Sequence, residues 1–534
     1  MRKWILALIG VAALSFAAFG QTATDRRQAC SNLSKLAVAQ TEIVQAAVVE
    51  AGTLDLHEAH PSSVFKYLPA FCRVVAMAKP TTDSDIKIEV WLPLTGWNGK
   101  FFGVGNGGFA GSIEYTGLAG AVLTGYAAGG TDTGHTGGAG EADWALGHPE
   151  KVVDFGWRGV HVMTDLSKTV VQAFYSAAAQ RSYFSSCSDG GREALMEAQR
   201  FPADYDGILA GAPAFNWTSL VSHSALLAKE LDSSPESYLP AGKIPAINAA
   251  VLQACQKGEP GAFLADPRAC HFLPETMVCN GAQTDTCLTP AQAASLKAIY
   301  ADANLKDGTF VYHGQLPGGE SGGGGWRLWI TGGISGASAD AGLSQGYFRN
   351  LVYSNPKWDP KSFDLDRDLK AAEAASTAAL DAVNPDLTPF KARGGKLILY
   401  HGWNDAAISP LATVDYVSSV RRKMGERQAE EFVRLFLVPG MQHCSGGPGP
   451  AEFGQYGHFN PTLDSAANNI TIALEDWVEK GTAPEQVTAR GNTDASGAGK
   501  GDSFSQPICA YPKAAIYKGS GDRKNAASYA CGMK

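Results

Sequence analysis

The stretch that decides the fold is residues 183–200, which read YFSSCSDGGREALMEAQR. Its first three residues are typical of a buried strand, and residues 191–200 have helical spacing. Between them, residues 186–190 resemble the G-x-S-x-G pattern of a hydrolase nucleophile elbow, with serine replacing the first glycine. Small flanking residues suit such an elbow because the turn is sharp and strained. The segment therefore predicts a strand, a tight turn that presents Ser188, and a helix; the alternative is an ordinary serine N-cap.

Further strands and helices are predicted on both sides of this turn. Strand-like runs cover residues 86–93, 101–104, 206–211, 396–400 and 432–438, and residues 160–175 have helical periodicity. Strands that alternate with helices indicate an α/β fold with a mainly parallel sheet. The last two runs are almost entirely apolar, as in strands buried on both faces.

The middle of the chain breaks this alternation. Four cysteines and a glycine-rich cluster, residues 318–325, fall in it. We interpret residues 216–380 as an inserted lid, and residues 21–215 and 381–534 as one catalytic α/β domain, with residues 1–20 as a signal peptide.

Two later loops carry the remaining residues of a candidate catalytic triad. The run 396–400 is followed by His401 and then Asp405, and the run 432–438 is followed by His443. This is the order Ser, Asp, His expected after successive strand ends. Asp405 is predicted to orient His443, which takes the proton of Ser188. The alternatives are a helix N-cap for Asp405 and a surface loop role for His443. His401 lies nearer to the strand end and is expected to pack in the core.

Catalysis at a carbonyl also needs N–H donors for the oxyanion. The residue after the nucleophile usually supplies one, which is the backbone N–H of Asp189 here. The glycine loop 105–108 is the candidate for the second donor, with Gly107 favoured and Gly108 next. The alternative is an ordinary tight turn.

Composition and the N-terminus limit the classes of function. The chain has 534 residues, 18% of them charged, and a formal net charge of −8, without a Lys/Arg run of nucleic-acid-binding density. Arg2 and Lys3 precede an apolar run from Trp4 to Phe19, which predicts a signal peptide cleaved near Gln21 and a secreted or periplasmic protein. The alternative is a membrane anchor, although about 16 apolar residues are few for a spanning helix.

Ten cysteines behind an export signal predict five disulfides, while no pair has zinc-knuckle spacing. Spacing alone favours Cys255–Cys270, Cys279–Cys287 and Cys509–Cys531. If Ser188 and His443 meet, their neighbours Cys187 and Cys444 must also be close, and Cys30–Cys72 then remains.

Several of these motifs together resemble the tannase and feruloyl esterase family. Similar stretches are residues 105–111, 188–213, 401–405 and 440–448, and the resemblance runs from about Cys30 to Cys531. It implies an α/β-hydrolase core with a large lid, the triad of Ser188, Asp405 and His443, and the five cysteine pairs. It also implies a serine carboxylesterase acting on small esters of aromatic acids, most readily feruloyl esters. Gallate esters and the mono-hydroxyethyl ester of terephthalate are the alternative substrates.

One departure from the family concerns calcium. Family members commonly carry an Asp-rich calcium loop between the cysteines that match Cys255 and Cys270. Here that loop contains only Glu259 and Asp266 as acidic residues, whereas calcium prefers several carboxylates among six to eight oxygens. We therefore expect no tight calcium site; ligation by carbonyl groups is the alternative. No organic cofactor is expected.

Substrate contacts are the least readable part of the sequence. Trp326, Trp329 and Phe348 are candidates for stacking on an aromatic ring, with core packing as the alternative. No membrane or nucleic-acid partner is expected, and the oligomeric state is left open. Two other classes of protein stay possible from sequence: an inactive binding protein on an esterase scaffold, and a peptidase.

Overall fold

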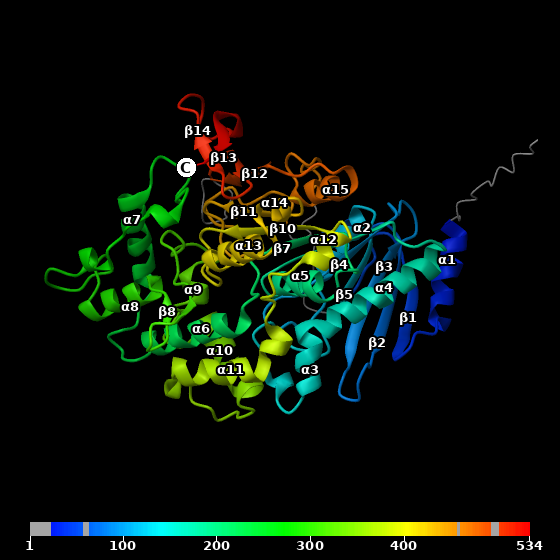
Figure 1. The fold of residues 1–534 in the computed structure, drawn as a ribbon, viewed down its shortest axis with the longest axis horizontal. Helices are drawn as coiled ribbons and strands as arrows, with labels where there is room; N and C mark the ends of the chain where they lie inside the picture. The colour runs from blue at the N-terminus through cyan, green and yellow to red at the C-terminus, as the bar shows by residue number, and fades with distance from the viewer. Residues whose placement is uncertain (1–22, 57–62, 456–459, 493–500, 534) are drawn as a thin grey trace, which may run out of the picture.

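The computed structural model describes residues 23–56, 63–455, 460–492 and 501–533. Its centre is a nine-stranded sheet in the order β1-β2-β3-β5-β4-β6-β7-β10-β11 (Figure 1). The strands are β1 (Thr41–Val49), β2 (Phe71–Ala78), β3 (Ile86–Pro93), β4 (Lys100–Val104), β5 (Ala127–Thr131), β6 (Arg181–Cys187), β7 (Gly207–Gly211), β10 (Lys396–Gly402) and β11 (Val433–Val438). The predicted signal peptide lies outside the described residues.

The sheet combines two kinds of pairing. Strands β5, β4, β6, β7, β10 and β11 are parallel to one another, as predicted for a mainly parallel α/β fold. Strands β1, β2 and β3 form an antiparallel ladder, and β3 pairs antiparallel with β5. The carboxyl ends of β6, β10 and β11 therefore lie along one edge, so the loops after them can meet.

Both faces of the sheet are covered, and alternate residues of each central strand point to opposite sides. In β10, Leu397 and Leu399 join one apolar cluster, whereas Ile398 and Tyr400 join the other. The first cluster includes residues of α4 (Gly159–Tyr175), α5 (Asp189–Arg200) and α13 (Pro410–Met424). The second includes residues of α2 (Tyr115–Leu123) and α15 (Ile470–Lys480). This explains why β10 and β11 are almost continuously apolar.

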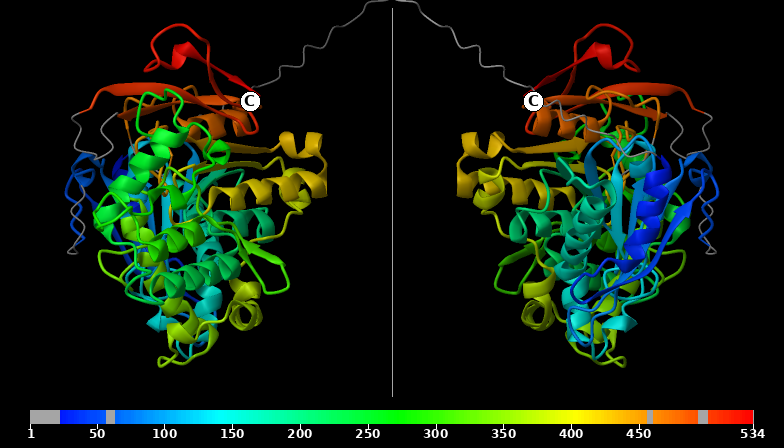
Figure 2. Two further views of the ribbon diagram at one scale, coloured as in Figure 1. Left: turned by 90° about the vertical axis from the view of Figure 1, so that its left-hand side faces the viewer. Right: turned by 90° about the vertical axis from the view of Figure 1, so that its right-hand side faces the viewer.

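Residues 216–380, the lid segment, lie beside the carboxyl edge of the sheet (Figures 1 and 2). Trp326, Ile330 and Leu296 belong to an apolar cluster formed mostly by this segment. Its two strands, β8 (Ala303–Asn304) and β9 (Phe310–Tyr312), pair with each other. Its helices are α6 (Trp217–Leu231), α7 (Ile244–Cys255), α8 (Pro290–Tyr300), α9 (Trp326–Trp329), α10 (Ala339–Gly346) and α11 (Leu365–Leu380).

The C-terminal residues add two small antiparallel sheets above the main one. Strands β12 (Gln486–Asn492) and β13 (Ser503–Cys509) pair with each other, as do β14 (Ala514–Tyr517) and β15 (Tyr529–Gly532). Within the described residues, no helix combines the length and the apolarity that crossing a membrane requires.

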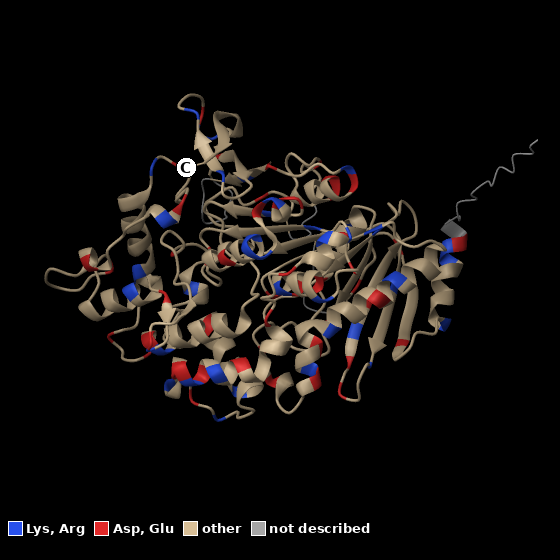
Figure 3. Cartoon of the chain, viewed as in Figure 1, with Lys and Arg blue, Asp and Glu red and all other residues tan. Residues whose placement is uncertain are grey.

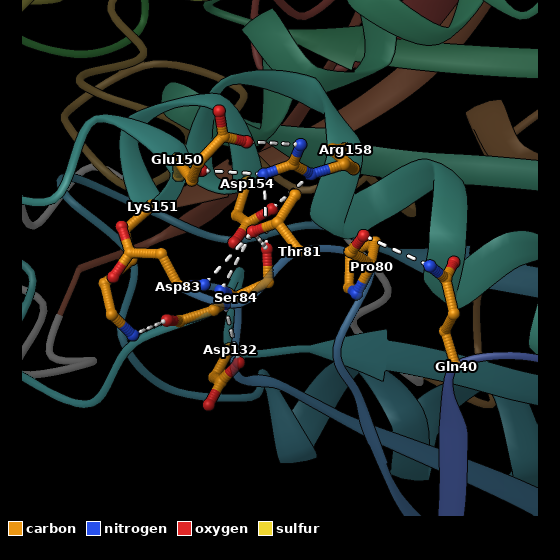
Figure 4. A network of polar contacts seen from close by, with 11 residues as sticks. Gln40, Pro80, Thr81, Asp83, Ser84, Asp132, Glu150, Lys151, Asp154 and Arg158 are labelled. Atoms are coloured by element: carbon orange, nitrogen blue, oxygen red, sulfur yellow. Dashed lines mark hydrogen bonds and ion pairs between the residues drawn. The ribbon is translucent and has the colours of Figure 1, made fainter.

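A polar network fixes the helical turns before α4 against the β2–β3 connection (Figure 4). Arg158 donates to Asp154 at 2.5 Å, to Glu150 at 2.8 Å and to Ser84 at 3.2 Å. Asp154 begins the helical turn η4 (Asp154–Arg158), which continues into α4. The network therefore anchors a segment whose carbonyl groups, those of Phe155 and Gly156, accept hydrogen bonds from Arg192 of α5.

Candidate active site

Ser188 lies at the turn between β6 and α5. Its backbone has φ +65° and ψ −123°, a strained conformation for a residue with a side chain. A Cβ atom added at Gly190 would collide with Ser186, and one at Gly191 would collide with the carbonyl oxygen of Gly211. The two positions after Asp189 therefore require glycine, which explains the spacing of the motif.

The three predicted triad residues meet at the carboxyl edge of the sheet. Ser188 Oγ lies 2.9 Å from His443 Nε2, and His443 Nδ1 lies 2.8 Å from Asp405 Oδ2. The side chain of Asp405 is fully buried, and that of His443 is 11% exposed. With His443 Nδ1 as donor and Nε2 as acceptor, this series of hydrogen bonds can move the hydroxyl proton of Ser188 to the imidazole.

Asp405 is held by more groups than the sequence indicates. Its Oδ1 accepts hydrogen bonds from the N–H groups of Ala407 and Ile408, at 2.9 and 3.0 Å. Its Oδ2 lies 3.1 Å from His401 Nε2 as well as close to His443. Burial alone raises the pKa of Asp405, but the positive charge of His443 and the two histidine hydrogen bonds outweigh it and hold that pKa well below its ordinary value. The carboxylate therefore stays ionised.

His401 is buried, as the packing interpretation expected, but it also orients Asp405. Its Nδ1 lies 2.8 Å from Thr413 Oγ1, which fixes the ring between α13 and the catalytic loop. A histidine four residues before the acid, at the end of the same strand, is the sequence signal that could have indicated this contact.

The candidate oxyanion donors are arranged differently from the favoured expectation. Gly108, not Gly107, lines the pocket that contains Ser188 and Asp189. Among the hydrogen bonds of the described residues, the N–H groups of Gly108 and Asp189 have no protein acceptor. Gly108 has φ +58°, which turns the loop here, and a Cβ atom would collide with the backbone of Ala139. The N–H of Gly107 likewise has no protein acceptor among the described residues, so Gly108 is the better-placed candidate only because it lines the pocket.

An ion pair not anticipated from sequence lies beneath the turn. Arg192 Nε donates to Asp189 Oδ1 at 2.6 Å, and both side chains are buried. The same guanidinium donates to the carbonyl groups of Gly156 and Phe155 in η4, at 2.5 and 3.2 Å. Burial raises the pKa of Asp189, although the charge of Arg192 opposes this. Arg192 thus ties the first turn of α5 to the segment anchored by Arg158.

Glu193 supports the glycine loop from below. Its Oε2 accepts the N–H of Asn106 at 2.9 Å. Complete burial, together with the nearby charge of Asp189, raises the pKa of Glu193 to about 8. The side chain is therefore protonated in the folded protein at neutral pH.

Replacing Glu193 with glutamine is expected to flatten the dependence of stability on pH. Between pH 4.5 and about 8, folded Glu193 keeps a proton that the unfolded chain has released, so the free energy of unfolding falls as pH rises. Glutamine keeps an acceptor for Asn106 but does not titrate. Melting temperatures of both proteins at about pH 5 and about pH 8 measure the difference. Equal losses in both proteins would show that Glu193 titrates normally.

The pocket above Ser188 is mostly apolar. Its walls include Trp217, Leu220 and Val221 of α6 and Leu343 of α10. Trp329 also lines it, and the centre of its ring lies 4.9 Å from that of His443.

The other two aromatic candidates do not line this pocket. Trp326 is fully buried and packs against Tyr300 inside the lid segment. Phe348 is fully buried between Trp358 and Phe363. Their suggested role in substrate stacking is therefore corrected to core packing, because both rings are enclosed by other lid residues.

All ten cysteines are paired. Cys187, next to Ser188, bonds to Cys444, next to His443, across 257 positions of sequence. The other pairs match those expected from spacing and elimination: Cys30–Cys72, Cys255–Cys270, Cys279–Cys287 and Cys509–Cys531. Ser188 and His443 are thus joined covalently through their neighbours.

The two acidic residues of the loop between Cys255 and Cys270 make hydrogen bonds within the chain. Both oxygens of Asp266 accept from the guanidinium of Arg268, at 2.9 and 2.8 Å. The oxygens of Glu259 accept the N–H groups of Lys257 and Ala265, at 2.7 and 3.3 Å. Both carboxylates of this loop therefore accept hydrogen bonds from donors within the chain.

Comparisons with known proteins identify the family of the chain. A family model described as "Tannase and feruloyl esterase" matches residues 72–532. An uncharacterised esterase of Xanthomonas campestris is 37% identical over 96% of this chain and 92% of its own length. A probable feruloyl esterase B of Aspergillus clavatus is 33% identical over 98% of this chain and 99% of its own length.

Solved structures give the same result. The crystal structure of feruloyl esterase B from Aspergillus oryzae superimposes with a TM-score of 0.84 and 29% identity, covering 95% of this chain and all of that one. A tannin acyl hydrolase from Aspergillus niger has a TM-score of 0.73 at 23% identity, covers 96% of this chain and 95% of that one, and shares the fold.

Proposed function

The chain belongs to the tannase and feruloyl esterase family and is a carboxylic ester hydrolase, and from this premise we propose that it hydrolyses feruloyl (hydroxycinnamate) esters through Ser188, His443 and Asp405. The observation that carries the proposal is the hydrogen-bonded chain from Ser188 through His443 to Asp405 at the mouth of an apolar pocket. The feruloyl preference is supported by the relatives named feruloyl esterase B.

In the first half of the reaction, Ser188 Oγ attacks the ester carbonyl while His443 Nε2 takes its proton. The N–H groups of Asp189 and Gly108 donate to the oxyanion of the tetrahedral intermediate. The C–O bond to the alcohol then breaks, and His443 returns the proton to the leaving alkoxide. The product of this half is an acyl-enzyme on Ser188.

In the second half, His443 takes a proton from water as the water attacks the acyl-enzyme. The tetrahedral intermediate collapses, Ser188 regains its proton, and the aromatic acid leaves. Asp405, kept ionised, stabilises the imidazolium in both halves. No organic cofactor takes part.

A panel of esters tests the substrate class. Methyl ferulate, methyl gallate and the mono-hydroxyethyl ester of terephthalate are the three substrates, and kcat/KM is the measurement. We expect the highest value on methyl ferulate. A higher value on either of the other two would reassign the enzyme as a gallate-ester or terephthalate half-ester hydrolase, and inactivity on all three would contradict an aromatic-acid esterase.

Calcium removal is expected to change neither activity nor stability, because both acidic residues of the loop 256–269 are engaged with donors of the chain. Purified protein treated with a chelator and protein supplied with calcium are compared by kcat/KM and Tm. Metal analysis of the untreated protein is the control. Stoichiometric calcium, or a lower Tm after chelation, would contradict the prediction.

We also propose export to an oxidising compartment, outside the cell or in the periplasm. Five disulfides support this, because such bonds persist where thiols are not kept reduced. Small esters are the proposed partners rather than nucleic acid, and the mixture of both charge signs supports this (Figure 3). Helix α11, for example, carries acidic and basic residues close together in sequence: Asp366, Arg367, Asp368 and Lys370.

A further inference from the structure

Asp340 places a buried carboxyl group in the pocket that contains Ser188. It belongs to the first turn of α10, in the lid segment, and is only 7% exposed. It lines the same pocket as Ser188, Trp217 and Leu343. An acidic residue inside an otherwise apolar wall is costly unless something pairs with it.

Within the described part of the chain, Asp340 has no hydrogen-bond or ion-pair partner. Capping of α10 does not account for the buried carboxyl group, because the Ala341 N–H donates to Ser338 Oγ, at 3.2 Å, and not to Asp340. Asp189, the other carboxyl of the pocket, differs because it is paired with Arg192. Burial and the negative charge of Asp405 raise the pKa of Asp340 well above its ordinary value. A neutral carboxyl can both donate and accept a hydrogen bond.

Ser224 adds a second polar group to the same wall. It lies on α6, which packs against α10, and is 6% exposed. Ser224 also lines the pocket, and its hydroxyl makes no hydrogen bond to the described residues. The lid segment therefore contributes two unpaired polar residues to a pocket whose other lid-segment walls are apolar.

The charges of the pocket exclude one kind of substrate. Among the described residues that line it there is no Lys, Arg or His. An acyl group with a carboxylate would lose its hydration there without gaining a cationic partner. An uncharged hydroxyl on the ring, by contrast, matches a neutral carboxyl and a serine.

We propose that Asp340, assisted by Ser224, determines specificity by hydrogen-bonding a phenolic hydroxyl on the ring of the acyl group. This rests on the proposed function and names the substrate class more narrowly: esters of hydroxylated aromatic acids, not of aromatic dicarboxylic acids. A site built to bind a hydroxyl discriminates against the analogue that lacks it, because its buried polar groups are then left unpaired.

The test compares two esters that differ by one hydroxyl, methyl 4-hydroxycinnamate and methyl cinnamate. The measured quantity is the ratio of their kcat/KM values. Wild-type enzyme is expected to prefer the hydroxylated ester by about tenfold or more. Asp340→Leu is expected to bring the ratio close to one, Ser224→Ala to reduce it in part, and Asp340→Asn to keep most of it, because the amide also donates and accepts.

A matched variant controls for the loss of a lid carboxyl. Asp366→Leu is the same substitution on α11, where the carboxylate contacts the backbone N–H and side chain of Lys306 outside the pocket. Its ratio is expected to equal that of wild type. Labelling of Ser188 by a serine-reactive phosphonate verifies that each variant is folded.

The outcomes separate this role from the proposed function. If Asp340→Leu leaves the ratio unchanged, or Asp340→Asn reduces it as far as Asp340→Leu does, the hydrogen-bonding role is overturned. Hydrolysis that Ser188→Ala abolishes keeps the proposed esterase mechanism standing in either case. A wild-type enzyme that hydrolyses neither ester overturns both.

Discussion

Replacing Ser188 with alanine is expected to lower kcat on methyl ferulate by about 10⁴- to 10⁶-fold, to the level that the oxyanion donors and substrate binding sustain alone. The reason is that Ser188 Oγ is the group within hydrogen-bonding distance of His443 Nε2, so no other side chain can inherit its proton transfer. Asp405→Asn is expected to cost about 10⁴-fold, since an amide favours the wrong tautomer of His443. Single-turnover and steady-state assays of the purified proteins measure both effects.

The neighbouring serine supplies the matched control. Ser186 lies two residues before Ser188, is fully buried, and its Oγ has no hydrogen-bond partner among the described residues. Ser186→Ala is therefore expected to keep kcat close to that of wild type. Full activity of Ser188→Ala would reject the mechanism, and equal losses at both positions would indicate damage to the turn and not to the nucleophile.

Removing the Cys187–Cys444 bond is the second large effect we expect. Replacing both cysteines with alanine frees a loop of 257 positions in the unfolded chain, which is expected to lower the free energy of unfolding by about 5 kcal/mol in the chain-entropy account. Activity is expected to fall by about 100-fold, because a small displacement of His443 relative to Ser188 is costly. Chemical denaturation and kcat are the measurements.

A second bridge separates these two effects. Cys279–Cys287 spans 8 positions within the lid segment, so removing it with two alanines is expected to cost about half as much stability. Its loss is expected to leave kcat close to that of wild type. If both double variants lose activity equally, the bridge between Cys187 and Cys444 stabilises the fold without positioning the base.

The sequence could predict the parts of the site that depend on strand ends. Ser188, Asp405 and His443 each follow a recognisable apolar run, and parallel strands bring such loops to one edge. Cys187 and Cys444 could be paired for the same reason, because they are the neighbours of Ser188 and His443. The elbow could be predicted from its own few residues. Gly190 and Gly191 have neighbours too close for any side chain, so the turn requires glycine there.

Features that depend on distant segments packing together were not readable. The antiparallel pairing of β3 with β5 passes over β4, which lies between them in sequence, and apolar runs do not reveal such an order. Trp326 and Phe348 are aromatic residues of the kind that bind rings, but both are fully buried within the lid segment. Asp340 and Ser224 are 116 positions apart, and only the packing of α6 against α10 gives them a common pocket.

The bond between Cys187 and Cys444 has a consequence for the integrity of the chain. A protease that cuts once anywhere in residues 216–380 would produce two fragments, one ending before the cut and one beginning after it. The first fragment contains Ser188 and the second contains Asp405 and His443, and the disulfide still holds them together. The nicked molecule would thus run as one species on a non-reducing gel and as two after reduction, and Ser188 and His443 would stay tethered until the bond is reduced.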